Sequence, residues 1–351
     1  MSAFSELLAC PACGGALQAT WVCGRCGARF DEVDGVLNLR LPADARTDAV
    51  RAFYDAAPFP GYPARESLDS LRAKAERHAF TRLLDRAIPP DARVVDIGCG
   101  TGQLCLYLAH AGRMVVGADL TRASLVMGAA AAARFGIDRV RFVETDLRRP
   151  GLARGAFDVV YSSGVLHHTP DPRRSFAAVA TLARPGGIIV VGLYNRFARV
   201  PSRARKIVAR LSGYRVVPFD PVLRDRGQDA GRREAWLRDQ YRHPEEHTHT
   251  IADVQHWFAE NDVEYLRTYP SAVWGDESSD LFAPAEDNWR FEGWFAQLGW
   301  MRTLGREGGL FFTIGARRAA GSDRRSQTRA RGHFNTDPQI PGSRKSVRML
   351  A

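Results

Sequence analysis

Between residues 93 and 194 the sequence alternates short apolar runs with amphipathic stretches, and this alternation restricts the possible folds more than any other feature. The periods predict strands at 93–98, 114–119, 140–145, 157–162 and 187–194, and helices at 102–111, 121–135 and 171–183. Strands that alternate with helices form a parallel sheet with helices on its faces. A helix at 250–260 and strands at 263–269 and 310–316 would complete a doubly wound α/β sheet of seven strands.

The first predicted strand ends in a glycine-rich turn, Asp96-Ile-Gly98-Cys99-Gly100-Thr-Gly102. Where a strand opens onto a helix, such a turn brings backbone N–H groups close to a ligand at the carboxyl edge of the sheet. A dinucleotide-binding turn would have glycine at position 103, where this chain has Gln103. An acid before the turn would repel a pyrophosphate, but it suits a ligand that carries an ammonium and a sulfonium group.

Two further acidic residues stand at the ends of the next two predicted strands. Asp119 ends the second strand, where a carboxylate accepts both hydroxyls of a ribose, and Asp146 follows the third strand, where an adenine would lie. The alternative is that both residues only cap helices or turns. The fourth strand is followed by a segment that contains Ser163, His167 and His168, and a Pro-Gly-Gly turn at 185–187 introduces the fifth.

In this order the motifs resemble the class I S-adenosylmethionine-dependent methyltransferases, over about residues 80–194. The resemblance implies a Rossmann-like fold, methyltransferase activity and S-adenosylmethionine as the cofactor. It also implies that the methionine moiety lies against the glycine turn, that Asp119 holds the ribose, and that Asp146 and Leu147 flank the adenine. The residues assigned to the cofactor on this basis are Asp96, Gly98, Cys99, Gly100, Asp119, Leu120, Asp146, Leu147 and Ser163.

Methyl transfer from a sulfonium requires alignment of donor and acceptor, and removal of a proton where the acceptor is a hydroxyl or an amine. His167 and His168 are the candidate bases, and core packing is the alternative for each. Tyr194 and Asn195 follow the fifth strand and are the candidate acceptor contacts. The His-His segment resembles enzymes that methylate quinone precursors and other small molecules, and also some that act on wobble uridines.

Four cysteines near the N-terminus form two Cys-x-x-Cys pairs, Cys10 with Cys13 and Cys23 with Cys26. Two such pairs on facing turns complete a tetrahedral site of four thiolates for structural zinc, and two disulfides are the alternative. Residues 1–41 are therefore predicted to be a zinc ribbon. It resembles the small zinc domain of certain bacterial ribosomal-RNA guanine methyltransferases and the zinc-ribbon partner subunits of RNA and protein methyltransferases.

The remaining segments have less specific patterns. Residues 42–65 are rich in proline, glycine and aromatic residues and are predicted to be a linker with aromatic anchors, followed by a helix at 66–87. The methyltransferase domain is expected to span 66–318, with insertions at about 196–247 and 271–300. Residues 319–351 lack an apolar period and are expected to be a disordered basic tail.

Two clusters in the insertions have both a functional and a structural interpretation. The histidines form a possible second metal site or, with more weight, a solvated or substrate-lining loop: His243, His247, His249 and His256. The aromatic residues could cover an acceptor, but helical spacing within the group predicts first a packing face: Trp274, Phe282, Trp289, Phe291, Trp294, Phe295 and Trp300.

Charge and hydropathy limit the kinds of partner that we expect for this chain. The formal net charge is +10, but residues 317–351 contain nine basic and two acidic residues, so the rest of the chain carries only +3. Because no apolar run approaches the roughly 20 residues that span a bilayer and no secretory signal is visible, we expect a cytoplasmic protein without membrane insertion. A small-molecule acceptor is slightly favoured over RNA. A non-catalytic binding module is the third possibility, and the three strand-end acids argue against it.

Overall fold

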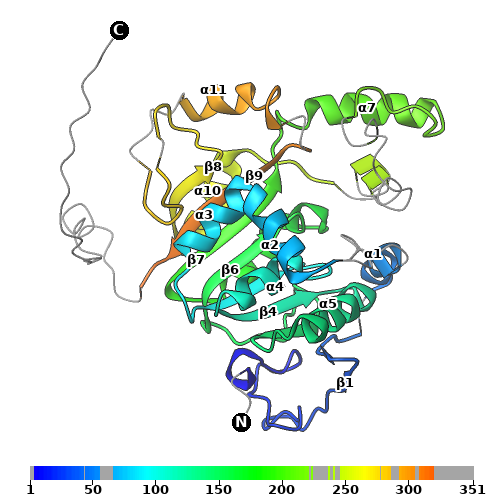
Figure 1. Ribbon diagram of the computed structural model, residues 1–351, viewed down its shortest axis with the longest axis vertical. Helices are drawn as coiled ribbons and strands as arrows, with labels where there is room; N and C mark the ends of the chain where they lie inside the picture. The colour runs from blue at the N-terminus through cyan, green and yellow to red at the C-terminus, as the bar shows by residue number, and fades with distance from the viewer. Residues whose placement is uncertain are drawn as a thin grey trace. The chain divides into compact units, whose positions relative to one another are not determined.

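The computed structural model places a mixed β-sheet of nine strands within the described part of the chain (Figure 1). The structure describes residues 4–42, 44–55, 66–220, 223, 236–237, 240–241, 246–276, 278–285, 292–304 and 308–319. The strands are β1 (Glu32–Val33), β2 (Val36–Asn38), β3 (Arg93–Ile97), β4 (Met114–Asp119), β5 (Val140–Glu144), β6 (Phe157–Ser163), β7 (Ala183–Tyr194), β8 (Val263–Tyr269) and β9 (Leu310–Arg317). They lie side by side in the order β1-β2-β5-β4-β3-β6-β7-β9-β8.

Helices cover both faces of this sheet. They are α1 (Ala45–Asp55), α2 (Leu68–Arg77), α3 (Ala79–Ala87), α4 (Gln103–His110), α5 (Arg122–Phe135), α6 (Pro172–Ala180), α7 (Val200–Leu211), α10 (Ile251–Glu260) and α11 (Glu292–Gly299). Side chains from α2, α3, α4 and α5 share one apolar cluster with Val94, whereas those from α6 and α10 share the other with Val95. The alternating side chains of β3 therefore reach two separate cores, as in a doubly wound fold.

The sequence predicted the central architecture. Strands β3 to β7 are parallel, β9 is antiparallel to β7 and β8, and all seven lie where the apolar runs predicted them. The predicted helix at 66–87 is instead two helices, because His78 takes an extended conformation between α2 and α3. This break lets α3 place Phe80 against the sheet, where its ring stacks on Phe312 with centroids 3.7 Å apart.

The sheet has two strands more than the seven predicted. β2 pairs in parallel with β5, and β1 pairs with β2 in an antiparallel turn. Leu37 of β2 is fully buried in the same apolar cluster as Val143 of β5. The segment expected to close the zinc ribbon therefore continues the sheet, and the expected boundary at residue 41 follows a strand of the main sheet.

The segment expected to be a linker begins with helix α1. Three arginines approach the buried carboxylate of Glu144, at 3.4, 3.5 and 3.4 Å: Arg40, Arg51 and Arg122. Because Arg51 belongs to α1 and Arg122 to α5, this acid at the end of β5 draws α1 toward the sheet. Residues 56–65, which hold three of the four prolines of the expected linker, lie outside the described residues.

The aromatic residues of α11 do not form the packing face that their spacing predicted, whereas Phe282 packs against the core. Trp294 and Phe295 of α11 are exposed, and so is Trp274, whereas Trp300 is buried. α11 instead buries Gln297, whose Oε1 accepts hydrogen bonds from Asn195 Nδ2 and from the backbone N–H of Ile251, both at 3.0 Å. The contact that buries α11 is therefore polar, where an apolar face was predicted. Trp289 and Phe291 lie outside the described residues.

The chain forms one compact unit as far as Arg318. The expected tail, apart from Ala319, lies outside the described residues. Among the helices that the structure describes, none has the length and apolar character needed to span a bilayer.

Candidate functional site

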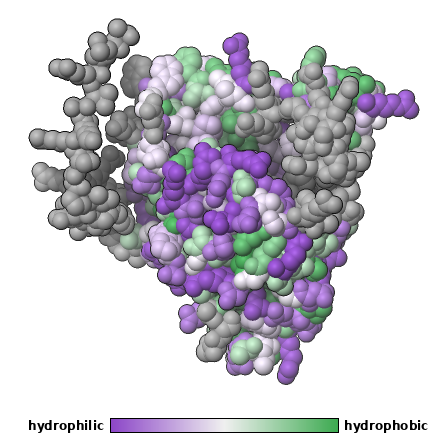
Figure 2. All heavy atoms as spheres, viewed as in Figure 1, coloured by the Kyte–Doolittle hydropathy of each residue, from purple (hydrophilic) through white to green (hydrophobic). Residues whose placement is uncertain are grey.

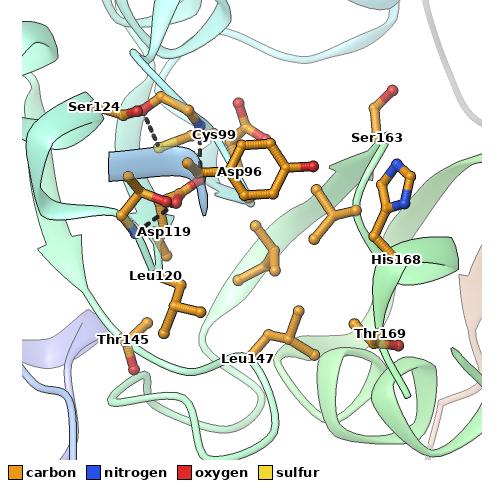
Figure 3. A pocket seen from close by; sticks show the side chains of 18 of the residues that line it. Asp96, Cys99, Asp119, Leu120, Ser124, Thr145, Leu147, Ser163, His168 and Thr169 are labelled. Carbon is orange, nitrogen blue, oxygen red and sulfur yellow. Dashed lines mark hydrogen bonds between the residues drawn. The ribbon is translucent and has the colours of Figure 1, made fainter. Parts of the chain in front are cut away.

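A cavity of about 440 Å³ opens at the carboxyl ends of β3, β4, β6 and β7 (Figure 3). β3 lies between β4 and β6, so the strand order reverses at this point, which is where open α/β sheets bind their ligands. All nine residues assigned to the cofactor line the cavity: Asp96, Gly98, Cys99, Gly100, Asp119, Leu120, Asp146, Leu147 and Ser163. The volume falls in the usual range of small-molecule sites.

The turn after β3 is shaped by glycine. Gly98 has a φ of +75°, and a Cβ there would lie 2.0 Å from Cγ2 of Val165. The backbone N–H of Gly98 donates to the carbonyl of Ala118 at 2.7 Å, which ties the turn to the end of β4. A side chain at position 98 would therefore displace the segment after β6 and change the cavity.

Asp119 organises the floor of the cavity. Its Oδ2 accepts a hydrogen bond from the backbone N–H of Gly100, and its Oδ1 accepts one from the backbone N–H of Thr121, each at 2.8 Å. Burial raises the pKa of Asp119, and these N–H donors act against that rise. The carboxylate lines the cavity, where it can also accept hydroxyl donors from a ligand.

Asp96 is the second acid of the cavity. Burial raises its pKa to about 7, and the neighbouring Asp119 adds to the rise, while the Cys105 thiol donates to Oδ2 at 3.5 Å and opposes it. A buried carboxyl poised between its two protonation states near neutrality responds strongly to a charged ligand. A cation in the cavity would favour the ionised form of Asp96.

The adenine side of the expected site is built by residues after β5 and by α1. Asp146 lines the cavity, and both of its oxygens accept hydrogen bonds from Nε of Arg148 at 3.1 Å. Arg148 also reaches Asp44 at 3.1 Å. The α1 residues Thr47, Val50 and Tyr54 line the same side. These residues were not predicted to line the site, although the i, i+4 spacing of Val50 and Tyr54 could have indicated a helix.

The side opposite Asp119 and Cys99 carries different chemistry. Figure 3 shows Ser163 and His168 across the cavity from these residues. Tyr194, from the end of β7, also lines the cavity, and its ring meets that of His168 edge-on with centroids 5.7 Å apart. The cavity thus joins an acidic side with a side that carries an imidazole, a hydroxyl and a phenol.

Two other predicted site residues take structural positions. His167 is fully buried and stacks on Tyr194 with centroids 3.9 Å apart, and it is absent from the described residues that line the cavity. Asn195 is also fully buried. Its Oδ1 accepts from the backbone N–H groups of Phe197 and Ala198 at 3.0 and 3.1 Å, so it shapes the turn that leads to α7. Thus His168 and Tyr194 line the cavity, whereas their sequence neighbours His167 and Asn195 do not.

A buried polar cluster supports Tyr194 from behind. Gln240 Nε2 donates to the Tyr194 hydroxyl at 2.8 Å, and the Arg199 guanidinium lies 3.9 Å above the Tyr194 ring. Arg199 also binds Glu246 through Nε and Nη2, at 3.0 and 2.7 Å. Burial acts to raise the pKa of Glu246, but Arg199 outweighs it, so the pKa is lowered overall. This cluster was not predicted from the sequence, because Arg199, Gln240 and Glu246 lie far apart in an insertion without a clear apolar period.

The described histidines of the predicted cluster also make structural contacts. The backbone N–H of His247 donates to the carbonyl of His167 at 2.8 Å, and His249 bridges Asn195 through a short parallel pairing. Burial lowers the pKa of His249 to about 4. His256 is exposed beside Glu260 at 3.1 Å. His243 lies outside the described residues.

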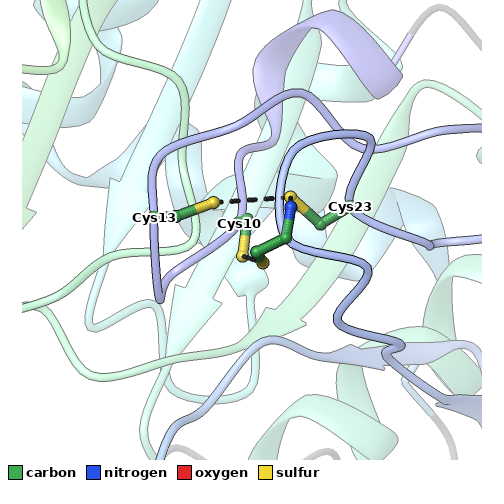
Figure 4. A group of neighbouring side chains, drawn as sticks. Cys10, Cys13 and Cys23 are labelled. Atoms are coloured by element: carbon green, nitrogen blue, oxygen red, sulfur yellow. Dashed lines mark hydrogen bonds between the residues drawn. The ribbon is translucent and has the colours of Figure 1, made fainter.

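The four N-terminal cysteines converge on one point (Figure 4). Their sulfur atoms all lie within 4.8 Å of one another, with 3.7 Å between Cys10 and Cys26 and 3.5 Å between Cys13 and Cys23. None of the four forms a disulfide, in which the sulfur atoms would be about 2.05 Å apart. Zinc–sulfur bonds of about 2.3 Å in a tetrahedron place the sulfur atoms about 3.8 Å apart, so the four thiols fit zinc.

The local backbone favours the thiolate of Cys23, whereas burial raises the pKa of Cys10. The backbone N–H of Cys26 donates to Cys23 Sγ at 3.5 Å, and that of Arg25 at 3.4 Å, and these bonds lower the pKa of Cys23 to about 6. Within the described residues, the four cysteines are the one group of three or more His, Cys, Asp or Glu side chains close enough to share a metal. The described histidines form no such group.

Comparison with known protein families matches residues 95–191 to a family described as a methyltransferase domain. The match begins in β3 and ends in β7. It therefore contains Asp96, Asp119, Asp146 and His168, and it leaves out the four-cysteine segment and everything after β7.

Among related sequences, an uncharacterized protein of Synechococcus is 28% identical over 250 residues, which cover 64% of this chain and 60% of that protein. A ubiquinone biosynthesis O-methyltransferase of Saccharophagus degradans is 33% identical over 113 residues, or 32% of this chain and 48% of that enzyme. One from Ralstonia nicotianae is 36% identical over 111 residues, or 30% of this chain and 45% of that enzyme. This chain thus spans about half the length of the two enzymes.

Similar solved structures include the magnesium protoporphyrin IX methyltransferase of Synechocystis with bound SAM. It is 15% identical, with a TM-score of 0.44 over 79% of this chain and 99% of that chain. Another is phosphoethanolamine N-methyltransferase 2 of Haemonchus contortus, at 14% identity and a TM-score of 0.43 over 76% of this chain and 60% of that chain.

Proposed function

Because residues 95–191 match a methyltransferase domain, we propose that the whole protein is a class I methyltransferase that transfers a methyl group from S-adenosylmethionine to a small-molecule acceptor. One observation carries the proposal. A single cavity holds Asp96 and Asp119 on one side and Ser163, His168 and Tyr194 on the other. Cofactor-binding groups and acceptor-binding groups thus meet in one space.

The cofactor supplies a methyl group on a positively charged sulfur. The carboxylate of Asp96 faces positive charge in the ligand, and the turn at Gly98 and Gly100 lets the backbone approach the ligand closely. Asp119 accepts hydrogen bonds from the two ribose hydroxyls. Asp146 and Leu147 flank the adenine, with Asp146 held in place by Arg148.

His168 and Tyr194 act on the acceptor side. A neutral imidazole at position 168 takes the proton from an acceptor hydroxyl as the methyl group is transferred. Tyr194 orients the acceptor, because Gln240 and Arg199 hold its phenol in one place. The similarity to O-methyltransferases of ubiquinone biosynthesis supports an oxygen atom of a small molecule as the acceptor.

Transfer to RNA is the alternative that the zinc ribbon would favour. The ribbon joins the sheet next to β5. Ser163 and Tyr194 lie at the ends of β6 and β7, and β4 and β3 stand between β5 and these two strands in the sheet. This separation supports a small acceptor over one that must touch both the ribbon and the cavity. A non-catalytic binding module is the other alternative.

The four cysteines hold one zinc ion with a structural role. Four thiolates fill the tetrahedron and leave no open position for a substrate or a water molecule. Zinc in this place fixes the two turns that carry Leu8 and Leu17 into the core shared with the sheet.

The test is methyl transfer from labelled S-adenosylmethionine to two fractions, small metabolites and RNA. We expect label in the small-metabolite fraction. His168→Gln should lower kcat by about 100-fold or more while leaving cofactor affinity unchanged, because the base acts only on the acceptor. His110→Gln, an exposed histidine on α4, is the matched control. Label in RNA would support the alternative, and cofactor binding without transfer to either fraction would support the binding module.

A further inference from the structure

Helix α7 turns its apolar stripe away from the protein. The exposed fractions are 43% for Val200, 61% for Ile207, 41% for Val208 and 84% for Leu211. These residues recur at helical spacing on one face, and the residues that α7 buries are the small Ser202 and Ala209. An amphipathic helix of a globular protein normally turns its apolar stripe toward the core, so α7 has the reverse orientation.

The exposed apolar residues continue beyond the helix. Val216 is 53% exposed and Phe219 is 79% exposed, in the segment that directly follows α7. On α11, Trp294 is 49% exposed, and its ring meets that of Phe197 edge-on with centroids 6.4 Å apart, just before α7 begins. We call the following residues together the α7 surface: Val200, Ile207, Val208, Leu211, Val216 and Phe219. Contiguous exposed apolar residues of this kind mark an interaction site.

The charges on α7 are all positive. The helix contains four cations and no acid: Arg203, Arg205, Lys206 and Arg210. Arg203 and Arg210 are exposed beside the apolar stripe. Figure 2, viewed from the same side as Figure 1, shows hydrophobic and strongly hydrophilic surface meeting over α7 at the upper right. The partner of this surface must therefore offer apolar contact and negative charge together.

We propose that the α7 surface docks onto an anionic lipid bilayer, with the helix lying in the plane of the membrane surface. A basic amphipathic helix binds such a surface because its apolar side chains enter the boundary between headgroups and acyl chains while its cations meet anionic headgroups. A second copy of this chain fits less well, because a twofold contact would set the exposed cations Arg203 and Arg210 of one α7 against those of the other. RNA would attract the cations but leaves Ile207 and Leu211 in water.

The position of α7 connects docking to the cavity. Arg199 immediately precedes the helix, and its guanidinium lies 3.9 Å above the ring of Tyr194, which lines the acceptor side. The docked surface therefore begins beside the acceptor side, so an acceptor that partitions into the bilayer would reach the cavity from there. This consequence rests on the proposed function, whereas docking itself does not.

The experiment is co-sedimentation of the full chain with vesicles, without cofactor or acceptor. We expect binding to vesicles of phosphatidylglycerol and phosphatidylcholine in equal parts, and little binding to phosphatidylcholine alone. The double variant Ile207→Gln/Leu211→Gln should weaken binding at least tenfold. Arg210→Gln should weaken it less and reduce its salt dependence. Val33→Gln and Arg77→Gln, which change an exposed apolar residue and an exposed cation elsewhere, should bind as the unchanged protein does.

A second measurement does not depend on how well the polar variants fold. In Leu211→Trp, brominated lipids in the same vesicles should quench the added fluorescence, since the indole would lie at the depth of the upper acyl chains. The proposal is overturned if the unchanged protein does not bind anionic vesicles, if the double variant binds as well as the unchanged protein, or if the indole added in Leu211→Trp is not quenched. It is also overturned if the double variant only converts a dimer to a monomer, or only abolishes RNA binding.

Discussion

The backbone N–H of Gly100 donates a hydrogen bond of 2.8 Å to Oδ2 of Asp119, and this bond joins the turn after β3 to the end of β4. The other oxygen of the same carboxylate accepts the N–H of Thr121 at the start of α5. One side chain thus holds both backbone segments that border the cavity. A change at Asp119 should therefore alter ligand contacts and the shape of the turn together.

Asp119→Ala should weaken binding of S-adenosylmethionine at least about tenfold, because it removes charge-assisted hydrogen bonds to the ligand and leaves the N–H of Gly100 unpaired. Titration calorimetry measures the change. Asp138→Ala, an exposed aspartate after α5, should bind as the unchanged protein does. Equal affinity in Asp119→Ala would exclude this residue from the cofactor site.

Affinity for S-adenosylmethionine should fall as the pH falls below 7. The pKa of Asp96 is raised to about 7, so at lower pH the carboxyl is protonated and must lose its proton before it can face a positive ligand. Protons and the ligand therefore compete for the ionised carboxyl of Asp96. Affinity should fall about tenfold between pH 8 and pH 6, and ligand binding near pH 6 should release a proton from this carboxyl. Calorimetry in buffers of different ionisation enthalpy measures both effects.

The control for this pH dependence is Asp96→Asn. The amide does not titrate, so its affinity should be lower than that of the unchanged protein at pH 8 and nearly constant down to pH 6. A steep pH dependence that persists in Asp96→Asn would assign the titration to another group.

Gly98→Ala should abolish cofactor binding and lower the midpoint of thermal unfolding. The φ of +75° costs an alanine about 1 kcal/mol, and the Cβ would also lie 2.0 Å from Val165. Gly136→Ala isolates the first effect, because Gly136 has a φ of +66° and nothing within 4 Å of the added Cβ. Differential scanning fluorimetry with and without cofactor should separate the two variants. Equal behaviour would mean that the approach to Val165 does not shape the cavity.

Metal analysis should find one zinc ion per chain, and Cys26→Ser should lose it. We expect the loss to lower the unfolding midpoint, because metal binding to a four-cysteine site contributes directly to folding. Cofactor affinity below that midpoint should change by less than about threefold, because no residue of 4–42 is among the described residues that line the cavity. Loss of cofactor binding in folded Cys26→Ser would show that β2 transmits the state of the cluster to β5.

The sequence by itself was sufficient for the central sheet, the line of acids at its edge and the four-cysteine cluster. Apolar runs of strand length predicted β3 to β7. A strand that is buried on both faces is apolar along its length, so its own residues are enough to identify it. Asp96, Asp119 and Asp146 stand at strand ends, and parallel strands bring their carboxyl ends to one edge. The cavity at that edge follows from local pattern and from this topological rule.

Only the tertiary structure decided which neighbouring residues reach the cavity and which surfaces remain exposed. β2 joins the sheet by pairing with β5, far away in the sequence, and α1 reaches the cavity because Glu144 and Arg148 bind it. His168 lines the cavity while His167 packs under Tyr194, although the two are adjacent in sequence. Trp294 faces outward because Gln297 takes the buried position of α11. Each outcome depends on contacts between distant residues, and local periodicity contains no information about such contacts.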